Sequence, residues 1–459
     1  MADSTSPQVA ARLRNPNAWT VFHLSWPMML KAIFLHGSVV IDGWLVSSLG
    51  ELSLASLGLA AAIAGFPLGA ILAFSHAMQV KTAQTFGTQN PLLRKSTLAS
   101  GLVISVVVTV IFVAILALFG AMILSLLTDN AQMISLALGY LWVFFIYIFA
   151  ESIGQCLSSY FNGCGRTKTP LYSLCLSVPV NVISSIIFIH GLFGMPALGL
   201  VGAAWGSVIG ALVQLSFLLF MLVRLDRDIF SIKGWQHGRF VTTLRRHFLF
   251  ALPIATTFIS ATFSSKVVLL IFAKLTLNEF AAMTLVMPWI MVAGTIGMQW
   301  SQATGIIVAQ LLGQKTPSSI LDSFLSKAWR GTFVAAAIVA AIYAILCLSS
   351  PYIYTNLTPE TQAILIGFLP ILVLLPFPKG SNAICGNTLR ASGDTLYVMN
   401  LFLAAQWLFR VPATALAVLV FQLPAFWVLS LLFFEELIKF APFHRRLYRG
   451  KWKHADVIN

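Results

Sequence analysis

Residues 101–120 read GLVISVVVTVIFVAILALFG and contain no charged, amide or proline side chain. A helix needs about 20 mostly apolar residues to cross the hydrocarbon core of a bilayer, and this stretch meets that requirement. Similar stretches recur along the chain of 459 residues, of which 58% are hydrophobic and 9% are charged. Soluble domains contain about 25% charged residues. The composition therefore excludes a soluble enzyme, a disordered chain and a secreted disulfide scaffold, and it predicts an all-α polytopic membrane protein.

Twelve transmembrane helices are expected from the apolar stretches and from the polar, glycine and proline residues that separate them. Twelve spans of about 20 residues require about 240 positions, which the apolar content supplies. The expected spans are 24–48, 53–86, 96–122, 132–162, 169–192, 197–224, 246–273, 279–312, 326–350, 359–390, 394–420 and 423–443.

Lysine and arginine are concentrated on one side of the predicted membrane. They lie in the N-terminal segment, in the connections from each even helix to the next odd helix, and in the C-terminal tail. Because basic loops stay in the cytoplasm, we expect a protein of the cell (inner) membrane whose two termini are both cytoplasmic. The polar start of the chain predicts that no signal peptide is present. Lys31, near the inner end of the first helix, is expected to extend toward the head groups. The net charge of +14 is thus a topology signal that also suits anionic lipids, and no nucleic-acid partner is expected.

The second half of the chain repeats the first, with motif residues that recur after 226 to 228 positions. The matching pairs are Pro27 and Pro253, Gly87 and Gly313, and Gly165 and Gly393. We therefore predict two pseudo-symmetric six-helix bundles: an N-terminal lobe at 1–224, a cytoplasmic inter-lobe loop at 225–243, and a C-terminal lobe at 244–459 with a basic tail. An even number of helices in each half makes the repeat parallel, which is typical of transporters that work by alternating access.

Several motifs resemble those of the multidrug and toxic compound extrusion (MATE) transporter family. They are GRTKTP at 165–170, LGLVGAA at 198–204 and LRASGDT at 389–395. Pro27 and Asp42 also resemble that family's first helix, where the proline bends the helix, and the resemblance covers essentially the whole chain. It implies a secondary antiporter, without enzymatic activity or cofactor, that exports small organic molecules while H+ or Na+ flows inward. Its expected partners are the substrate, the coupling cation and membrane lipids, and we expect a monomer.

Carboxylates within the N-terminal lobe are the candidate coupling residues, because an ionisable group in a bilayer is costly unless it is paired or hydrated. Asp42 lies fifteen residues beyond Pro27, about 22 Å along the helix, in the outer half of the membrane. The family resemblance implies that H+ enters through Asp42, with Asn181 as its partner. Ser185, where some members have Asp, favours H+ over Na+. Glu151 is the third cation-coupling candidate.

At positions equivalent or close to those of the coupling candidates, the C-terminal lobe has the cations Lys266, Lys379 and Arg410. Lys379 is the repeat equivalent of Glu151, and Lys266 maps two residues before Asp42. We expect these three cations to bind substrate, so that an acidic lobe couples protons and a basic lobe holds an anionic or zwitterionic solute. The alternative is that some of them are interfacial or paired.

Two local features are expected near these cations. Pro376 and Pro378 should bend the predicted helix at 359–390 just before Lys379, because proline removes a helical hydrogen bond. Lys439 follows two glutamates by four and three residues, a spacing that favours pairing along one helix. Those glutamates are Glu435 and Glu436.

Other functions remain as alternatives. The cations of the C-terminal lobe would suit a lipid-linked precursor flippase of the same superfamily, although such flippases often have extra helices and lack the loop motifs found here. Export coupled to Na+ is a second alternative. A channel is a third, but no filter-like, glycine-rich re-entrant segment occurs in the sequence. The chain has no Walker A pattern, metal-ligand cluster or nucleophile constellation, and its five cysteines predict neither a disulfide nor a metal site.

Overall fold

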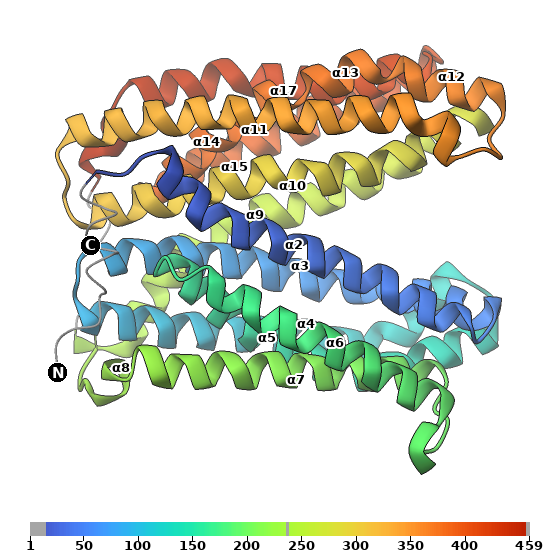
Figure 1. The fold of residues 1–459 in the computed structure, drawn as a ribbon, viewed down its shortest axis with the longest axis horizontal. Helices are drawn as coiled ribbons and strands as arrows, with labels where there is room; N and C mark the ends of the chain where they lie inside the picture. Colours follow the sequence, from blue (N-terminus) through green and yellow to red (C-terminus); the bar gives the residue numbers. More distant parts are fainter. Residues whose placement is uncertain (1–14, 236–237, 456–459) are drawn as a thin grey trace. The chain divides into compact units, whose positions relative to one another are not determined.

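The computed structural model describes residues 15–235 and 238–455. In these ranges the chain is helical and contains no strand, which confirms the predicted all-α class (Figure 1). The predictions of a cytoplasmic N-terminus and of no signal peptide concern residues 1–14, which lie outside the described part.

The helices follow one another with short connections. In the first half they are α2 (Ala18–Ser47), α3 (Glu51–Gly87), α4 (Pro91–Leu127), α5 (Ala131–Gly163), α6 (Lys168–His190), the short η1 (Leu192–Gly194), α7 (Leu200–Leu225) and α8 (Asp228–Ser231). In the second half they are α9 (Phe240–Phe272), α10 (Leu277–Gly313), α11 (Ser318–Ile353), α12 (Pro359–Gly367), α13 (Leu369–Leu374), α14 (Pro376–Ala391), α15 (Thr395–Ala404), η3 (Ala405–Arg410), α16 (Val411–Ala415), η4 (Leu416–Val420), α17 (Ala425–Tyr448) and η5 (Lys451–His454).

The predicted count of twelve spans is not confirmed. Among the described residues, ten helices are long and apolar enough to cross a membrane, or eleven if the bent pair Pro359–Leu374 and Pro376–Ala391 forms one span. The helices of that pair meet at 41°, which confirms the bend expected at the prolines before Lys379. The twelfth predicted span, 423–443, corresponds to α17, whose apolar run is interrupted by two glutamates and a lysine.

The boundaries of the helices reproduce the sequence repeat. Helices α3 and α10 both have 37 residues and begin 226 positions apart. The chain turns in the same way after equivalent helices, because Gly165 and Gly393 have φ angles of 75° and 91°. This left-handed region favours glycine. Gln89 and Lys315, also 226 positions apart, share a positive φ as well, at 57° and 53°. The sequence repeat is therefore present in the backbone and not only in the motifs.

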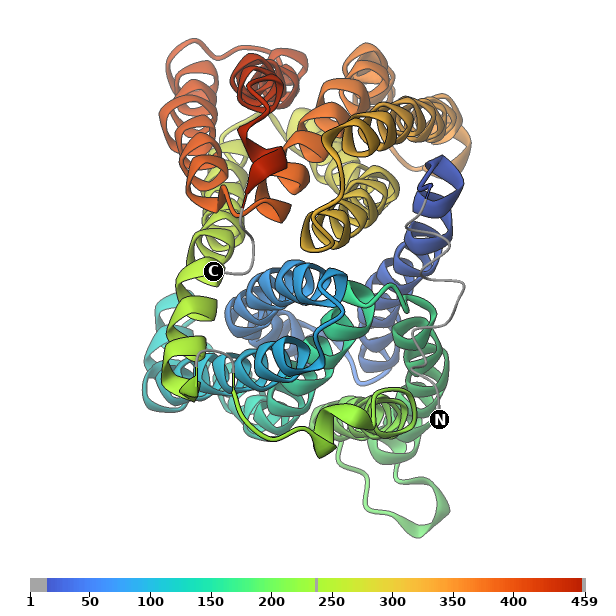
Figure 2. The same cartoon turned by 90° about the vertical axis from the view of Figure 1, so that its left-hand side faces the viewer.

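The chain forms two compact units. One comprises Leu30–Ala255, and the other comprises Thr256–Asn459 together with Met1–Met29, of which residues 15–29 and 256–455 are described. Seen end on, the helices within each unit lie side by side (Figure 2). The division falls within α2 and α9, two residues after Pro27 and Pro253 respectively. Helix α2 is continuous through Pro27, and the expected bend there stays a prediction.

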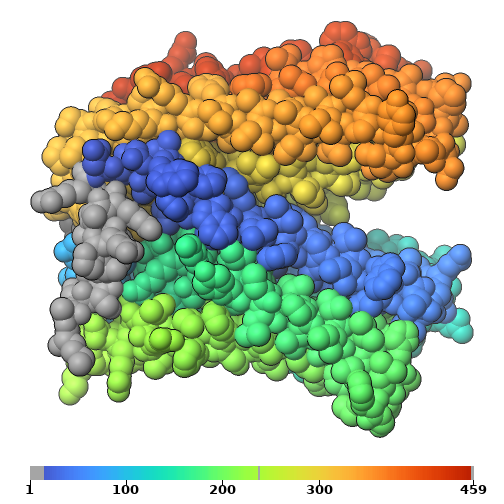
Figure 3. Space-filling view, in the orientation of Figure 1, coloured from blue at the N-terminus to red at the C-terminus, as the bar shows by residue number. Residues whose placement is uncertain are grey.

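Small residues bring α6 and α7 together in the unit Leu30–Ala255, where the two helices lie side by side on one face (Figure 3). A Cβ atom added at Gly210 would lie 2.7 Å from the Cβ of Asn181, and one at Gly202 would lie 2.7 Å from the backbone nitrogen of Ile189. Close approach of this kind is how helices pack in lipid, where burial alone provides no driving force. The glycines of α7 thus fix the position of Asn181.

Candidate functional site

Asp42 is half-buried in α2, and its Oδ1 is buried without a hydrogen-bond partner among the described residues. The carboxylate interacts electrostatically with Tyr140 and Tyr147 on α5. Buried polar atoms are nearly always hydrogen-bonded, and a carboxylate in an apolar unit is a functional candidate, so the role of Asp42 in cation coupling stays a prediction that this exception supports.

Asn181, the predicted partner of Asp42, is buried on α6. Its Oδ1 accepts a hydrogen bond from the Ser185 hydroxyl at 3.1 Å. No hydrogen bond joins it to Asp42 in the described residues, so the structure does not bring the predicted pair into direct contact. The role of Asn181 in cation coupling stays a prediction.

Glu151 belongs to a buried chain of side chains that links α5 to α2. Gln155 donates from Nε2 to Oε1 of Glu151 at 2.6 Å, and its own Oε1 accepts from the ammonium of Lys31 at 3.1 Å. Lys31 is only 9% exposed and also attracts Glu151 electrostatically. The prediction that Lys31 extends toward the head groups is therefore wrong. Gln155 bridges the two charges at a position that the sequence analysis missed.

Removing the cation of this chain should destabilise the fold. In Lys31→Met, Glu151 keeps only an amide partner in a buried site, and we expect a loss of about 1 to 3 kcal/mol of stability. The double variant Lys31→Met/Glu151→Gln should recover part of that loss, because no unpaired charge is left. Thermal melting of the two variants in detergent measures the difference, and equal melting temperatures would contradict the coupling between Lys31 and Glu151.

The unit that comprises Thr256–Asn459, called the second unit below, contains a denser network of buried charges. Lys439 donates to Glu435 Oε1 at 3.1 Å and to Glu436 Oε1 at 2.9 Å, which confirms the local pairing on α17. Arg410 Nη1 lies 3.5 Å from Glu435 Oε2, and Asn382 on α14 donates to Glu436 Oε2 at 2.8 Å. This network (Asn382, Arg410, Glu435, Glu436 and Lys439) joins three helical segments of one unit.

The structure brings Lys379 and Arg410 to the same network but leaves Lys266 apart from it. Lys379 is half-buried on α14 and interacts electrostatically with Glu436. Its ammonium makes no hydrogen bond or salt bridge to the described residues. Lys266 is exposed on α9. Of the three predicted substrate-binding cations, Arg410 thus belongs to the network, Lys379 interacts with it electrostatically, and Lys266 lies apart, so their role in substrate binding stays a prediction.

A π-helical segment positions Arg410. The segment η3 ends just before Pro412, which lacks an N–H group and disturbs the regular hydrogen bonding of the helix. Ser260 on α9 holds this segment: it donates to Gln406 Oε1 and accepts from Trp407 Nε1, both at 2.8 Å. Arg410 Nη2 also donates to Ser264. Ser260 of α9 therefore fixes the position of the segment η3.

Glu435, Glu436 and Asn382 are the candidate residues that the sequence analysis did not assign to a site. The signal was present, since three ionisable residues stand in the middle of the apolar stretch AFWVLSLLFFEELIKFAP. Their local pairing was expected, but their burial and the contact of Glu435 with Arg410 were not. Among the described residues, no group of three or more His, Cys, Asp or Glu side chains could hold a metal ion.

The loop motifs stabilise turns. Arg166 of the GRTKTP motif lies 2.8 Å from Asp226 Oδ2, and Arg94 lies 3.4 Å from Asp226 Oδ1. In the second half Asp394 of the LRASGDT motif accepts from Arg446 at 2.7 Å. These ion pairs connect the motif loops to neighbouring helices.

Comparisons with known proteins identify the family. The MatE family model matches residues 27–187 and 253–416, two segments that begin 226 positions apart. The probable multidrug resistance protein YoeA of Bacillus subtilis (strain 168) is 22% identical over 430 residues, which cover 90% of this chain and 89% of that protein. The probable multidrug resistance protein NorM of Caulobacter vibrioides is 23% identical over 323 residues, 69% of this chain and 67% of that protein.

Solved structures show the same fold. A MOP superfamily transporter from Pyrococcus furiosus matches with a TM-score of 0.83 at 18% identity, over 98% of this chain and 100% of that chain. The Vibrio cholerae MATE transporter VcmN in its bent form matches with a TM-score of 0.83 at 16% identity, over 98% of this chain and 99% of that chain. The chain therefore belongs to the MatE family of multidrug transporters, and it is a multi-pass membrane protein that transports small compounds.

Proposed function

We propose that the protein is a secondary antiporter that exports small organic molecules, drugs or metabolites, by alternating access and takes H+ inward through Asp42. The observation that carries this proposal is the buried Oδ1 of Asp42 without a hydrogen-bond partner in the described residues. An unsatisfied buried carboxylate is costly, and uptake of a proton removes its charge. Coupling then requires only that the proton and the substrate prefer different conformations.

The surroundings of Asp42 favour H+ over Na+ as the coupling ion. A hard metal cation needs several oxygen ligands, whereas a proton needs one carboxylate. Asn181 and Ser185 are hydrogen-bonded to each other, and Lys31 already compensates the charge of Glu151 through Gln155. We assign Glu151 and Asn181 to the same coupling path as Asp42, as groups that respond to its protonation.

The charges of the second unit favour an anionic or zwitterionic substrate. Three cations, Lys379, Arg410 and Lys439, lie around two carboxylates, Glu435 and Glu436, and the ammonium of Lys379 makes no hydrogen bond or salt bridge to the described residues. The excess positive charge would attract an anionic group of the solute. The Pyrococcus furiosus transporter is a structural neighbour whose binding pocket has reverse polarity, and this polarity suggests a different function for that protein.

Neutralising the predicted substrate cations tests this part of the proposal. Lys379→Met should weaken the transport of a polycarboxylate such as citrate about tenfold, because a charge-assisted hydrogen bond contributes about 1.5 kcal/mol or more. Lys266→Met should have a smaller effect, since Lys266 lies apart from the network. Transport by proteoliposomes is measured for citrate and for ethidium, which serves as the cationic control. If the double variant Lys379→Met/Lys266→Met exports every substrate like wild type, the basic substrate site does not exist.

The remaining features of the proposal follow the distribution of charge. We place the protein in the cell (inner) membrane with both termini in the cytoplasm, as a monomer that needs only the substrate, the coupling cation and lipids as partners and no cofactor. The lysines and arginines of the N-terminal segment, of the connections from even to odd predicted helices and of the C-terminal tail support this orientation.

The excess positive charge beside Lys379 also favours one other function, the translocation of a lipid-linked precursor with an anionic head group. A labelled-lipid translocation assay in proteoliposomes distinguishes the two functions. Lipid movement without exchange of soluble solutes for H+ would favour the flippase and count against the antiporter.

A further inference from the structure

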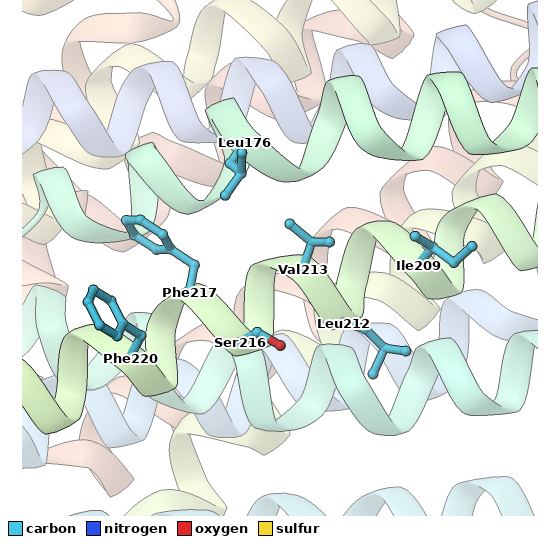
Figure 4. Close-up of a pocket in the computed structure, with 7 residues that line it drawn as sticks. All are labelled: Leu176, Ile209, Leu212, Val213, Ser216, Phe217 and Phe220. Atoms are coloured by element: carbon cyan, nitrogen blue, oxygen red, sulfur yellow. The ribbon is translucent and has the colours of Figure 1, made fainter.

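An open apolar groove runs between α6 and α7 on the surface of the unit Leu30–Ala255. Its volume is about 390 Å³. Figure 4 shows Leu176 of α6 and the side chains of Val213 and Phe217 of α7 at its walls. The seven lining residues are Leu176, Ile209, Leu212, Val213, Ser216, Phe217 and Phe220, and Ser216 is the only polar one among them.

The groove begins where the close packing of the two helices ends. Gly202, Gly206 and Gly210 bring α7 against α6, and the part of α7 beyond Gly210 has no further glycine. Beyond Gly210, α7 presents larger side chains such as Phe217 to the groove. Pro179 lies inside α6 at the same level and removes one of its backbone hydrogen bonds. The groove is thus a consequence of the sequence of this helical hairpin.

Cations stand at one end of the groove. Arg224 is exposed in the last turn of α7, four residues beyond Phe220, and makes no hydrogen bond or ion pair with the described residues. Lys168 begins α6, eight residues before Leu176. Because α6 and α7 are consecutive and antiparallel, both cations lie at the end that we assign to the cytoplasm. Tyr172, 53% exposed, lies on the same face of α6 between Lys168 and Leu176.

We propose that this groove binds one acyl chain of an anionic glycerophospholipid from the cytoplasmic leaflet, with the phosphate group at Arg224 and Lys168. From Ile209 to Phe220 the wall of the groove is about 16 Å long. The hydrocarbon of one leaflet is about 15 Å thick, half of a bilayer core, so the groove matches the length of a chain in place. Basic pockets beside membrane helices recognise anionic head groups.

The chemistry of the groove selects this occupant. A zwitterionic lipid would gain less from Arg224, because its own cation offsets the phosphate. An organic cation would be repelled by Arg224 and would find no carboxylate among the seven lining residues. The groove lies within one unit and involves neither Asp42 nor the charge network, so the lipid site is independent of the proposed antiport.

Thermal melting of the purified full-length protein in detergent, with added phosphatidylglycerol or phosphatidylcholine, tests the site. Phosphatidylglycerol should stabilise the wild type at lower concentration than phosphatidylcholine does. Arg224→Gln should raise the concentration of phosphatidylglycerol needed about fivefold, the value expected for one basic residue near an anionic lipid. Val213→Trp, which fills the groove, should abolish the preference.

Matched variants control for general effects. Val110→Trp adds the same ring at an exposed position of α4, and Arg445→Gln removes an exposed cation from α17. Both should respond to phosphatidylglycerol like wild type. The proposal is overturned if the two lipids act equally on wild type, if Arg224→Gln and Arg445→Gln respond alike, or if ethidium stabilises the wild type through Val213 while phosphatidylglycerol does not. Arg224 is exposed, so its variant should fold even if Val213→Trp does not.

Discussion

Asp42→Asn is expected to reduce export driven by a proton gradient to the level of membranes that lack the protein. The amide keeps the size of the side chain but cannot exchange a proton, so the step that returns the carrier to its other conformation is lost. In wild type, substrate binding should weaken as the pH falls, because protonation of Asp42 favours the conformation that substrate does not prefer. In the variant, binding should no longer depend on pH through this group.

The measurement is the affinity of the purified protein for its transported solute at alkaline and acidic pH, beside transport in proteoliposomes. Asp129→Asn makes the same chemical change at an exposed loop position and should behave like wild type. A pH-dependent affinity that survives in Asp42→Asn would assign the coupling to another group.

Glu435→Gln should destabilise its unit more strongly than Lys31→Met destabilises the unit Leu30–Ala255. It leaves Arg410, Lys439 and Lys379 opposite one carboxylate, Glu436, in a buried site. Removing one partner of a buried ion pair typically costs about 3 to 5 kcal/mol, because the remaining charges are uncompensated. Thermal melting in detergent should therefore show a large drop in melting temperature.

A double-mutant cycle separates this coupling from simple loss of packing. Glu435→Gln combined with Arg410→Gln removes one charge of each sign, so the net charge of the network returns to its wild-type value. The double variant should therefore recover part of the lost stability. The control Glu51→Gln makes the same change at an exposed position and should stay within about 0.5 kcal/mol of wild type. If Glu435→Gln melts like Glu51→Gln, the buried network contributes nothing to stability.

The repeat and the bounds of some helices were accessible from the sequence because they depend on local patterns. The spans predicted at 53–86 and 279–312 differ by no more than two residues at either end from α3 and α10. The bend before Lys379 was accessible for the same reason, since proline acts on its own helix.

Contacts between distant helices were not accessible in this way. Lys31 and Gln155 are 124 positions apart, and nothing in the local sequence of either shows that they meet. The charges on α17 also lie outside what a local apolar pattern can predict, because they compensate one another through ion pairs, one of which reaches Arg410 on another helical segment.

The repeat alignment also could not tell which way Lys266 points. Lys266 corresponds to Val40, two residues before Asp42, and two residues turn a helix by about 200°. Val40 is 71% exposed, and Lys266 is exposed as well. A position close to Asp42 along the chain thus lies on another face of the helix, which is why Lys266 does not join Lys379 and Arg410.

Everted membrane vesicles that hold a proton gradient, reported by a quenched dye, test the central claim most directly. Ethidium and then a polycarboxylate are added to vesicles with wild type or Asp42→Asn. The account predicts that a transported solute collapses the gradient in wild type, that the variant does not respond, and that the responding solute is the polycarboxylate. A response that needs a sodium gradient, a response that persists in Asp42→Asn, or no response to either solute under either gradient would contradict proton antiport through Asp42.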